Sequence, residues 1–453
     1  MPRLVVIIVS WNTCDLLRRC LESVHASLAG SGIDYTIVVV DNASSDGTPA
    51  MVRAEHPEVQ LLEPGRNLGF AGGTNLALRV ILDRTRSENR EPRLALERGE
   101  GTENRRMRDE RREMGDGRQQ TGDERQETTT QSAICNLQST TRNLQSAICN
   151  PHSVFPDYVL LLNPDTEVVG DAIPRLVRYL EAHSDVAVAG PQLRYPNGSA
   201  QPSRRRFPTP GTFFWESTPL EQRWPNNPWA RRYRCADTPD EVEQEVDWLV
   251  GAALLVRVAA IERAGLLDTG FAMYSEELEW QRRIRAASYG VAERRKEWET
   301  GDRSHEPRDG RWEAGGEGAT QYLPRVAHRA AMGDAEERGD GSSIRAPRPT
   351  GQSAIRIVYV PEAVVIHHEG KSSEQVPAWR LIQFQRSRLR YARMVYGSRF
   401  AGALRLFLLG AYSVELALEG AKWLLGHKRP LRAQRVGSYW QVVCALGASN
   451  AER

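Results

Sequence analysis

One stretch, residues 157–169 (DYVLLLNPDTEVV), constrains the fold of this chain more than any other. Its apolar run, 158–162, is typical of a strand buried on both faces, as in a parallel sheet covered by helices. The run ends abruptly in Asn163, Pro164 and Asp165. Asp165 is therefore expected at the carboxyl end of the strand, where open α/β sheets bind their ligands. A carboxylate there suits a divalent cation, although Asp after Asn-Pro also begins ordinary turns.

Composition and charge exclude several functional classes. The 453 residues allow two or three average domains, and 60 Lys and Arg nearly balance 58 Asp and Glu, so bulk charge does not favour a nucleic-acid partner. The six cysteines form no CxxC pair and are expected to be free thiols of a reducing compartment. The apolar run 4–9 lacks a signal-peptide cleavage region, and no uninterrupted apolar stretch is long enough to span a bilayer.

Strand and helix patterns alternate through the first part of the chain and predict a doubly wound α/β fold. Polar residues follow the first two predicted strands, at Ser10 and Asp41, and a Gly-rich turn, 67–75, precedes a helix. We expect these residues to gather with Asp165 at one edge of the sheet. The strands are predicted over 3–10, 35–40 and 59–62, and the helices over 15–28, 49–56 and 76–82.

Acidic residues open a predicted helix in the second half. Ser275 is a candidate N-cap, followed by Glu276, Glu277 and Glu279. Carboxylates favour helix N-termini, and Glu279 with Arg283 makes an ordinary i,i+4 pair, so Glu276 and Glu279 need no catalytic explanation. Glu277 is explained less well in this way, because neighbouring like charges disfavour ionising all three. It is therefore the carboxylate of the three that is a candidate general base.

Two histidines follow a predicted strand, 357–360, in the segment VVIHHEG at 364–370. A lone histidine is more often structural, but a neutral imidazole at a strand end could complete a metal site with Asp165. We favour His367 as the ligand, with His368 as the fallback.

Two further features leave alternatives open. The basic turn 204–206 could grip an acidic acceptor, such as a lipid-linked phosphate, or could be a solvated loop. Gly251 lies in the apolar stretch 247–253, which leads into a predicted strand, 254–257. It would allow a sugar to approach the backbone closely, or it could mark a bulge.

Two segments of low complexity interrupt the α/β pattern. Residues 84–154 contain no Phe, Trp or Tyr and carry the repeat QSAICN at 131–136 and 145–150; residues 291–354 have a similar character. Such segments cannot bury enough apolar area to offset their ordering entropy, so we expect disordered inserts, with a partner-binding arm as the alternative. Both fall between a helix and a strand, so we expect them at the edge opposite the ligand site.

The end of the chain predicts helices over 379–396 and 400–425. Charges at Arg405, Glu415, Glu419 and Lys422 argue against a membrane span. Two alternatives remain: a helical hairpin that covers the sheet, or an amphipathic segment that lies in the membrane interface. The second would be helped by a basic cluster of Lys422, His427, Lys428, Arg429, Arg432 and Arg435.

Seven sequence blocks, in order, resemble the family 2 glycosyltransferases and, more narrowly, their rhamnosyltransferase-like branch. They are VSWN, VVVDNASSDGT, NLGFAGGTN, LLLNPDTEV, WLVGAALLVR, GLLDTGFAMYSEELEW and VVIHHEGKSS. The resemblance implies a GT-A type α/β domain, a doubly wound mixed sheet with a helical C-terminal extension and the two inserts. The expected parts are a nucleotide-binding part (1–83), an insert (84–156), a metal- and acceptor-binding part (157–290), a second insert (291–354), the end of the domain (355–398) and the extension (399–453).

The resemblance also implies roles for named residues in an inverting transfer from a nucleotide sugar. Asp41 would bind the nucleobase, Asp165 and His367 would hold Mg²⁺ or Mn²⁺ on the diphosphate, and Glu277 would take the acceptor proton. The family usually carries Asp at the position of Glu277, so this chain places its base one methylene further out. Other implied donor-binding residues are Ser10, Asn12, Asn67, Gly69, Phe70, Asn163 and Gly251, supported by Glu276, Glu279, Arg283 and Trp248.

The suggested donor is dTDP-rhamnose, and the suggested acceptor is a glycan or lipid-linked hydroxyl in cell-surface polysaccharide synthesis. The implied location is the cytoplasm, at the inner face of the cell membrane, with peripheral contact through 399–435 and no nucleic-acid partner. Two rivals are a transferase that uses a UDP- or GDP-sugar and a catalytically silent, membrane-docked binding protein.

Overall fold

The structure is a computed structural model that describes residues 1–88, 156–216, 218–287, 355–370, 377–426 and 428–448. The two segments predicted to be inserts, 84–156 and 291–354, lie almost wholly outside the described residues. Both are bracketed by well-formed elements: a helix precedes each of them and a strand follows.

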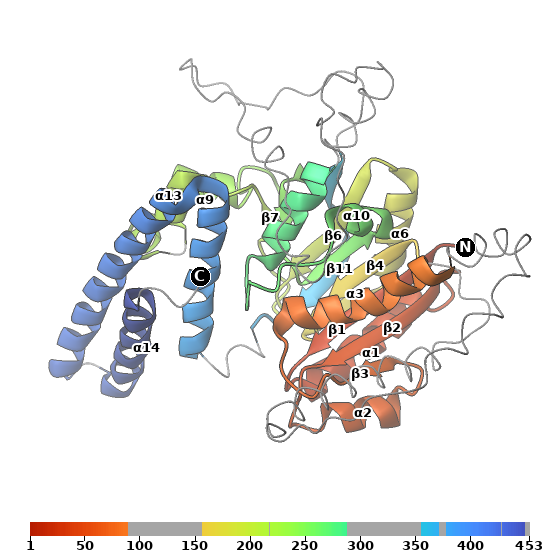
Figure 1. The fold of residues 1–453 in the computed structure, drawn as a ribbon, viewed down its shortest axis with the longest axis horizontal. Helices are drawn as coiled ribbons and strands as arrows, with labels where there is room; N and C mark the ends of the chain where they lie inside the picture. Colours follow the sequence, from red (N-terminus) through yellow and green to blue (C-terminus); the bar gives the residue numbers. More distant parts are fainter. Residues whose placement is uncertain (89–155, 217, 288–354, 371–376, 427, 449–453) are drawn as a thin grey trace, which may run out of the picture.

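A mixed sheet of nine strands forms the centre of the molecule (Figure 1). The first four strands are parallel, whereas β10 runs antiparallel to both β4 and β6, so β6 and β11 again point in the direction of β4. The strand order is β3 (Gln60–Leu62), β2 (Asp34–Asp41), β1 (Arg3–Ser10), β4 (Tyr158–Leu162), β10 (Ala253–Arg257), β6 (Val186–Arg194), β11 (Arg356–His367) and β5 (Thr166–Val169), with β8 (Gln244–Val246) paired to β11.

These directions give the sheet two chemically different edges. The carboxyl ends of β1, β2, β4 and β11 meet at one edge, which we call the carboxyl rim. The segment that enters antiparallel β10 reaches the same edge. The opposite edge, the amino rim, receives the starts of β1, β4 and β11, and the described chain breaks off before β4 and before β11 at that rim.

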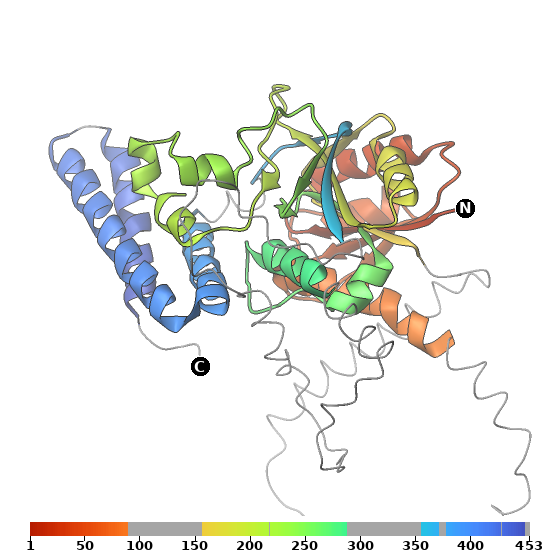
Figure 2. The ribbon, with the colours of Figure 1, turned by 90° about the horizontal axis from the view of Figure 1, so that it is seen from above.

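Helices cover both faces of the sheet, as Figures 1 and 2 show. Strand β1 alternates between two cores: Leu4, Val6 and Ile8 face one core, and Ile7 faces the other. The first core is closed by α1 (Cys14–Leu28), α2 (Thr48–Glu55) and α6 (Ala172–Ala182), and the second by α3 (Gly69–Glu88), α10 (Val258–Ala264) and the helix at 276–287. All five residues of β4 are buried, which confirms a doubly wound sheet.

Several element boundaries differ from the prediction, and α3 ends at Glu88, five residues into the first predicted insert. Helix α3 begins at Gly69 rather than near residue 76, because Asn67 Oδ1 accepts the backbone N–H of Gly69 (2.8 Å) and turns the chain into the helix early. The predicted strand 357–360 and the residues up to His367 form one strand, β11, whose register against β6 shifts between Val360 and Val364. Pro361 has no N–H for the ladder, so an irregularity at this point is expected.

The C-terminal extension lies beside the sheet and does not cover it, in contrast to one of the predicted alternatives (Figures 1 and 2). Helix α13 (Pro377–Leu424) changes direction at Gly397, whose φ is 84°, and its second part pairs with α14 (Arg429–Gly447). Its first part joins a third core with α7 (Pro210–Trp215) and the two-stranded pair β7 (Arg204–Arg205) and β9 (Trp248–Leu249). Two short helices, α8 (Pro219–Arg223) and α9 (Pro228–Tyr233), complete this region.

The surface of the extension is unusually apolar. By length and composition alone α13 could cross a membrane, with 22% of its apolar window buried. The sequence predicted no span because of the charges along 400–425, but the qualifying window contains no more than two of them. The apolar side chains most exposed on α13 and α14 are Trp379, Leu406, Val414, Leu418, Trp423, Leu424 and Trp440.

The predicted basic cluster is partly neutralised within the extension. Glu419 is buried and forms ion pairs with Lys422 (2.9 Å), Arg432 and Arg435 (3.8 Å). Arg432 and Arg435 therefore join α14 to α13, Lys422 pairs within α13, and Lys428 and Arg429 are further positive charges at the turn. His427 lies outside the described residues.

Candidate active site

A carboxylate and an imidazole meet at the carboxyl rim. Oδ1 of Asp165, beyond the end of β4, lies 3.3 Å from Nε2 of His367, the last residue of β11, and both residues are 5% exposed. The backbone N–H of His368 donates to the carbonyl of Asp165 (2.9 Å), so the two strand ends are joined by main chain as well. The antiparallel pairing of β5 with β11, in which His367 lies opposite Thr166, brings these residues together.

The hydrogen bonds of the two histidines distinguish their roles. Nδ1 of His367 lies 3.0 Å from Oε1 of Gln201, which can only accept a hydrogen bond; Nδ1–H therefore donates to it, and the lone pair lies on Nε2, toward Asp165. His368 instead directs Nε2 at Oε1 of Glu167 (2.7 Å). Of the two, His367 therefore has the arrangement of a metal ligand and His368 that of a surface ion pair.

The donor set fits a divalent cation. A carboxylate oxygen and an imidazole nitrogen on adjacent positions of one octahedral ion lie about 3 Å apart for bonds of about 2.1–2.2 Å. The observed separation of 3.3 Å is close to that value. Mg²⁺ and Mn²⁺ accept such oxygen-rich sites and take their remaining ligands from water and substrate phosphate.

The acidic helix start lies against Gly251. A Cβ on Gly251 would stand 3.4 Å from Cγ of Glu277, so the glycine leaves the space that this side chain occupies. Gly251 lies in the turn before β10 and not in a bulge of the strand, which was one of its two predicted roles. Oε2 of Glu277 is buried and has no hydrogen-bond partner among the described residues. Burial raises the pKa of Glu277, while hydrogen bonds from backbone N–H groups, including that of Gly251, and the charge of Arg205 oppose the rise.

The other two acids behave differently. Glu276 is buried, and burial together with the neighbouring charge of Glu277 raises its pKa well above the ordinary value. Glu279 forms the predicted i,i+4 pair with Arg283, at 2.7 and 2.9 Å. Arg283 also donates to the carbonyls of Ala264 and Leu266, so this pair anchors the helix and the preceding loop.

One backbone hydrogen bond connects the metal pair to the acidic helix. The N–H of Asn163, two residues before Asp165, donates to the carbonyl of Ala252 (2.9 Å), the residue after Gly251. Nδ2 of Asn163 also lies 3.5 Å from Nε2 of His367. Asn163 is thus in contact with both halves of the candidate site.

A second polar group lies at the ends of β1 and β2. Asp41 is buried; its Oδ2 accepts the N–H of Ser44 (2.9 Å), and its Oδ1 has no partner among the described residues. Ser10 is also buried and shares a hydrogen bond with Thr13 (2.9 Å). Oδ1 of Asn12 accepts the N–H of Ser45 (2.8 Å), which closes the two loops against each other. Asp41 thus keeps one buried carboxylate oxygen that could accept a hydrogen bond from a ligand.

The predicted Gly-rich turn is held against this group. The side chain of Asn42 donates to the carbonyl of Gly69 (3.2 Å) and accepts the N–H of Leu68 (3.3 Å). A Cβ on Gly69 would stand 3.0 Å from the carbonyl oxygen of Ala272, so this glycine permits close packing with the loop that precedes Glu276. Phe70 packs on the core beneath.

Two sequence features have mainly structural roles. Trp248 is buried, and its indole N–H donates to the carbonyl of Arg206 (3.0 Å). In the basic turn Arg204 is buried, pairs with Asp240 and donates to the carbonyl of Pro239 (2.8 Å). The turn is therefore not a solvated loop, and Arg205 and Arg206 are the members left to meet a ligand.

Sequence reasoning missed residues that act through others. Gln201 orients His367, Asn42 holds the Gly-rich turn, and Gln281 makes two hydrogen bonds to the backbone of Leu249 (2.9 and 2.7 Å). A lone glutamine in a polar loop carries no pattern that points to a histidine 166 positions away. Of these three residues, only Asn42 could have been suspected from the sequence, because it directly follows the predicted site residue Asp41.

Comparison with known proteins agrees with the residue blocks. The family model described as Glycosyl transferase family 2 matches residues 5–82. An N-acetylglucosaminyl-diphospho-decaprenol L-rhamnosyltransferase of Mycobacterium tuberculosis is 26% identical over 286 residues, which cover 63% of this chain and 71% of that protein. The succinoglycan biosynthesis protein ExoO of Rhizobium meliloti is 36% identical over 78 residues, 17% of this chain and 22% of that protein.

Solved structures show a more distant likeness. The mannosyltransferase PcManGT of Pyrobaculum calidifontis, in complex with GDP-Man and Mn²⁺, aligns with a TM-score of 0.37 and 14% identity, covering 100% of this chain and 87% of that chain. S. aureus TarS 1-349 aligns with a TM-score of 0.36 and 11% identity, covering 100% of this chain and 93% of that chain.

Proposed function

We propose that this chain, a family 2 glycosyltransferase of the rhamnosyltransferase-like kind, transfers a sugar with inversion from a nucleotide donor to an acceptor hydroxyl. The donor suggested by the resemblance is dTDP-rhamnose, and UDP- and GDP-sugars are its rivals. One observation carries the proposal: the pair Asp165–His367 (3.3 Å) and the carboxylate of Glu277 occupy the same rim, linked through Asn163 and Ala252.

Residues at different positions along the carboxyl rim would bind the nucleobase, hold the cation and accept the proton. The unpartnered Oδ1 of Asp41 would accept an N–H of the nucleobase, which removes the cost of a buried acceptor without a partner. Asp165 and His367 would hold the cation, which when bound neutralises charge on the donor diphosphate as it leaves. Glu277 would take the proton of the acceptor hydroxyl, and its raised pKa makes it a stronger base than an exposed glutamate.

The acceptor side of the proposal rests on the basic turn. The charge of Arg205 acts on Glu277, so the turn lies beside the proposed base. Next to it, a cavity of about 270 Å³ is lined by Arg206 and Arg232 together with Phe207, Trp229 and Tyr233. Arginines beside aromatic side chains suit a diphosphate that continues into an apolar chain. The M. tuberculosis relative, by its name, acts on a diphospho-decaprenol acceptor, which is of this class.

We place the enzyme at the inner face of the cell membrane through peripheral contact of residues 399–435. The support is the exposed apolar surface of α13, where Leu406 is 72% exposed and Val414 59%, with Lys428 and Arg429 at its end. Such a surface matches the interfacial layer of a bilayer that carries anionic lipids. Carbonate extraction of membranes tests this: a peripheral protein is released, whereas a protein that spans through α13 stays in the pellet.

A donor screen is the experiment that tests the function most directly. The full-length protein is incubated with dTDP-rhamnose, UDP- and GDP-sugars, each with and without Mn²⁺, and Tm is measured. We expect the largest rise with one nucleotide sugar in the presence of Mn²⁺. Equal and negligible shifts for every nucleotide would contradict a donor site at the carboxyl rim.

The substitution Glu277→Gln separates the enzyme from a silent binding protein. It keeps the shape of the side chain but removes the proton acceptor, so transfer should fall by about 10²–10⁴-fold while the Mn²⁺-dependent Tm shift by the donor persists. Glu262→Gln, at an exposed position of α10, serves as the matched acidic control. Unchanged transfer in Glu277→Gln would exclude this residue as the base.

A further inference from the structure

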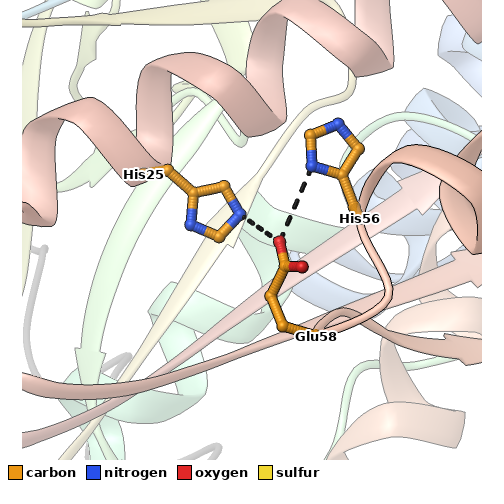
Figure 3. Close-up of side chains that lie close together, drawn as sticks. All are labelled: His25, His56 and Glu58. Carbon is orange, nitrogen blue, oxygen red and sulfur yellow. Dashed lines mark ion pairs between the residues drawn. The ribbon is translucent and has the colours of Figure 1, made fainter.

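A second group of metal-ligating side chains lies at the amino rim, outside the candidate active site. It consists of His25 in the last turn of α1, His56 directly after α2, and Glu58 before β3. Figure 3 shows both imidazoles turned toward the same carboxylate. One ligand atom from each residue lies within 4.8 Å of the other two.

The hydrogen bonding of these side chains is incomplete, although His25 and Glu58 are close enough for an ion pair. Nε2 of His25 lies 2.8 Å from Oε1 of Glu58 but is buried and makes no hydrogen bond with any described residue. Nδ1 of His56 lies 3.7 Å from the same oxygen, beyond hydrogen-bond distance, although the residue is buried. A buried imidazole without a partner costs free energy. One cation between the three atoms would give all of them a ligand bond.

Hydrogen bonds around the cluster orient His25 and fix the turn that holds His56 and Glu58. The phenol oxygen of Tyr35, at the start of β2, lies 3.1 Å from Nδ1 of His25. If Nδ1 donates to this oxygen, the lone pair of Nε2 points toward Glu58, as in the outer shell of histidine metal sites. His56 and Glu58 share one turn, closed by a hydrogen bond from Val59 N–H to the carbonyl of His56 (3.0 Å). The ligand positions are thus set by the ends of regular elements.

We propose that His25, His56 and Glu58 bind a zinc ion, with water as the fourth ligand. Two imidazoles and one carboxylate suit Zn²⁺ or Co²⁺ much better than Mg²⁺ or Mn²⁺, which prefer oxygen. Tetrahedral bonds of about 2.0–2.1 Å place ligand atoms about 3.4 Å apart. Oε1 of Glu58 would therefore move away from Nε2 of His25 (2.8 Å) and slightly toward Nδ1 of His56 (3.7 Å). Glu58 is 53% exposed and is free to make this movement. The ion would join α1 to the α2–β3 connection.

Binding is tested on the full-length protein with Zn²⁺ and Co²⁺ as probes, in an Asp165→Asn background that removes the carboxylate of the carboxyl rim. We expect Zn²⁺ to raise Tm and Co²⁺ to give the intense visible absorption of a tetrahedral site. Both signals should be lost, with affinity reduced at least tenfold, in Glu58→Gln and in His56→Gln. Glu58 is exposed, so its variant gives the answer even if His56→Gln does not fold.

Two further variants separate this site from other histidines. Tyr35→Phe leaves the ligands in place but removes the partner of His25, and should weaken Co²⁺ about tenfold. His183→Ala removes an imidazole at the end of α6 that lies outside the cluster, and should leave Co²⁺ absorption unchanged. Wild-type Co²⁺ affinity in Glu58→Gln, or loss of the absorption in His183→Ala, would overturn the proposal.

Discussion

The two rims of the sheet are built from the same strands but tolerate very different local structure. At the carboxyl rim five residues other than glycine have left-handed backbone, namely Asn12, Ala43, Tyr274, Ser275 and Glu369. At the amino rim the positive φ values in the loops next to the sheet belong to glycines, such as Gly30 and Gly32. Left-handed backbone in other residues is disfavoured and concentrates at functional sites.

The rims also differ in how their polar groups are satisfied. The carboxyl rim holds buried oxygens without partners on Asp41, Glu276 and Glu277. The amino rim ends mostly in ion pairs at partly exposed positions, such as Arg356 with Asp185 (2.6 Å). The cluster of His25, His56 and Glu58 is an exception, as is the buried Nη1 of Arg3 at the start of β1. Buried polar groups without partners lower the stability of the fold, and they gather at the rim where a ligand is expected. Substitutions at the two rims can test this contrast.

The largest effect is expected from Asp165→Asn at the carboxyl rim. The amide is a poor metal ligand, so Mn²⁺-dependent transfer should fall by about 10³-fold or more, as expected when several kcal/mol of charge stabilisation is lost. Donor turnover measured against Mn²⁺ concentration checks this. Asp185→Asn, at the amino rim, is the matched control and should leave turnover nearly unchanged. Equal turnover in both variants would remove the functional contrast between the rims.

Asp41→Asn should act on donor affinity. The amide oxygen of the variant would have to accept the hydrogen bond from the N–H of Ser44, so the new NH₂ group would take the place of the unpartnered carboxylate oxygen. This NH₂ group would then face an N–H of the nucleobase, and two donors cannot form a hydrogen bond. Loss of one such bond costs about 1–3 kcal/mol, so the donor KM should rise about 10- to 100-fold with kcat little changed. Titration calorimetry with the nucleoside diphosphate measures the same loss. An unaltered affinity would show that Asp41 does not contact the base.

Gly251→Ala tests whether the space beside Glu277 matters. A Cβ would stand 3.4 Å from Cγ of Glu277, so the side chain should shift by a few tenths of an ångström and transfer should fall about tenfold. Gly437→Ala, whose added Cβ meets no atom within 4 Å, is the control for the extra methyl group. If kcat in Gly251→Ala equals that of the control, Glu277 is not held by this glycine.

Glu276→Gln should change pH dependence more than rate. Burial raises the pKa of both Glu276 and Glu277, so transfer is lost as pH falls through a raised pKa, above the ordinary range of glutamate. Removing one carboxyl of this coupled pair should move the acid limb to lower pH, with the plateau rate within about threefold of wild type. In wild type, stability should also fall as pH rises through this window, because the unfolded chain loses its protons first. An unmoved acid limb would contradict the coupling.

The smallest effect is expected from shortening the segment 89–155 to a short Gly-Ser linker. It joins α3 to β4 at the amino rim, and each halving of a flexible loop changes closure entropy by only about 0.6 kcal/mol. We expect kcat/KM within about twofold of wild type and a slightly higher Tm. A large loss of transfer would mean that the segment reaches the carboxyl rim and that the two rims are not independent.

Much of the fold was accessible from the sequence because buried strands carry a strong signal. Residues 3–10 and 158–162 were predicted with the bounds that β1 and β4 have, since apolar runs end where polar rim loops begin. Glu279 and Arg283 were predicted as a pair because helical spacing fixes their distance. The start of α3 was missed, since a Gly-rich stretch predicts a loop and the capping hydrogen bond of Asn67 overrode that tendency.

The site was harder to predict where it depends on contacts across the fold. The position of His367 beside Asp165 follows from the antiparallel pairing of β5 with β11, in which His367 lies opposite Thr166, and the apolar periodicity of the sequence does not reveal strand order. The orientation of His367 by Gln201 and the fit of Glu277 against Gly251 are likewise products of packing. The third core, where α13 meets α7, was not foreseen for the same reason.

The bend at Gly397 bears on how the molecule would stand on a lipid surface. The part of α13 before this residue packs on the body of the protein, and the turns that follow it do so as well, since Leu404 and Leu408 belong to the third core. A backbone φ of 84° suits glycine far better than any residue with a side chain. The bend and the packing that follows it together set the tilt between the body and the exposed apolar end of α13, and with it the height at which the carboxyl rim would meet a headgroup-borne sugar.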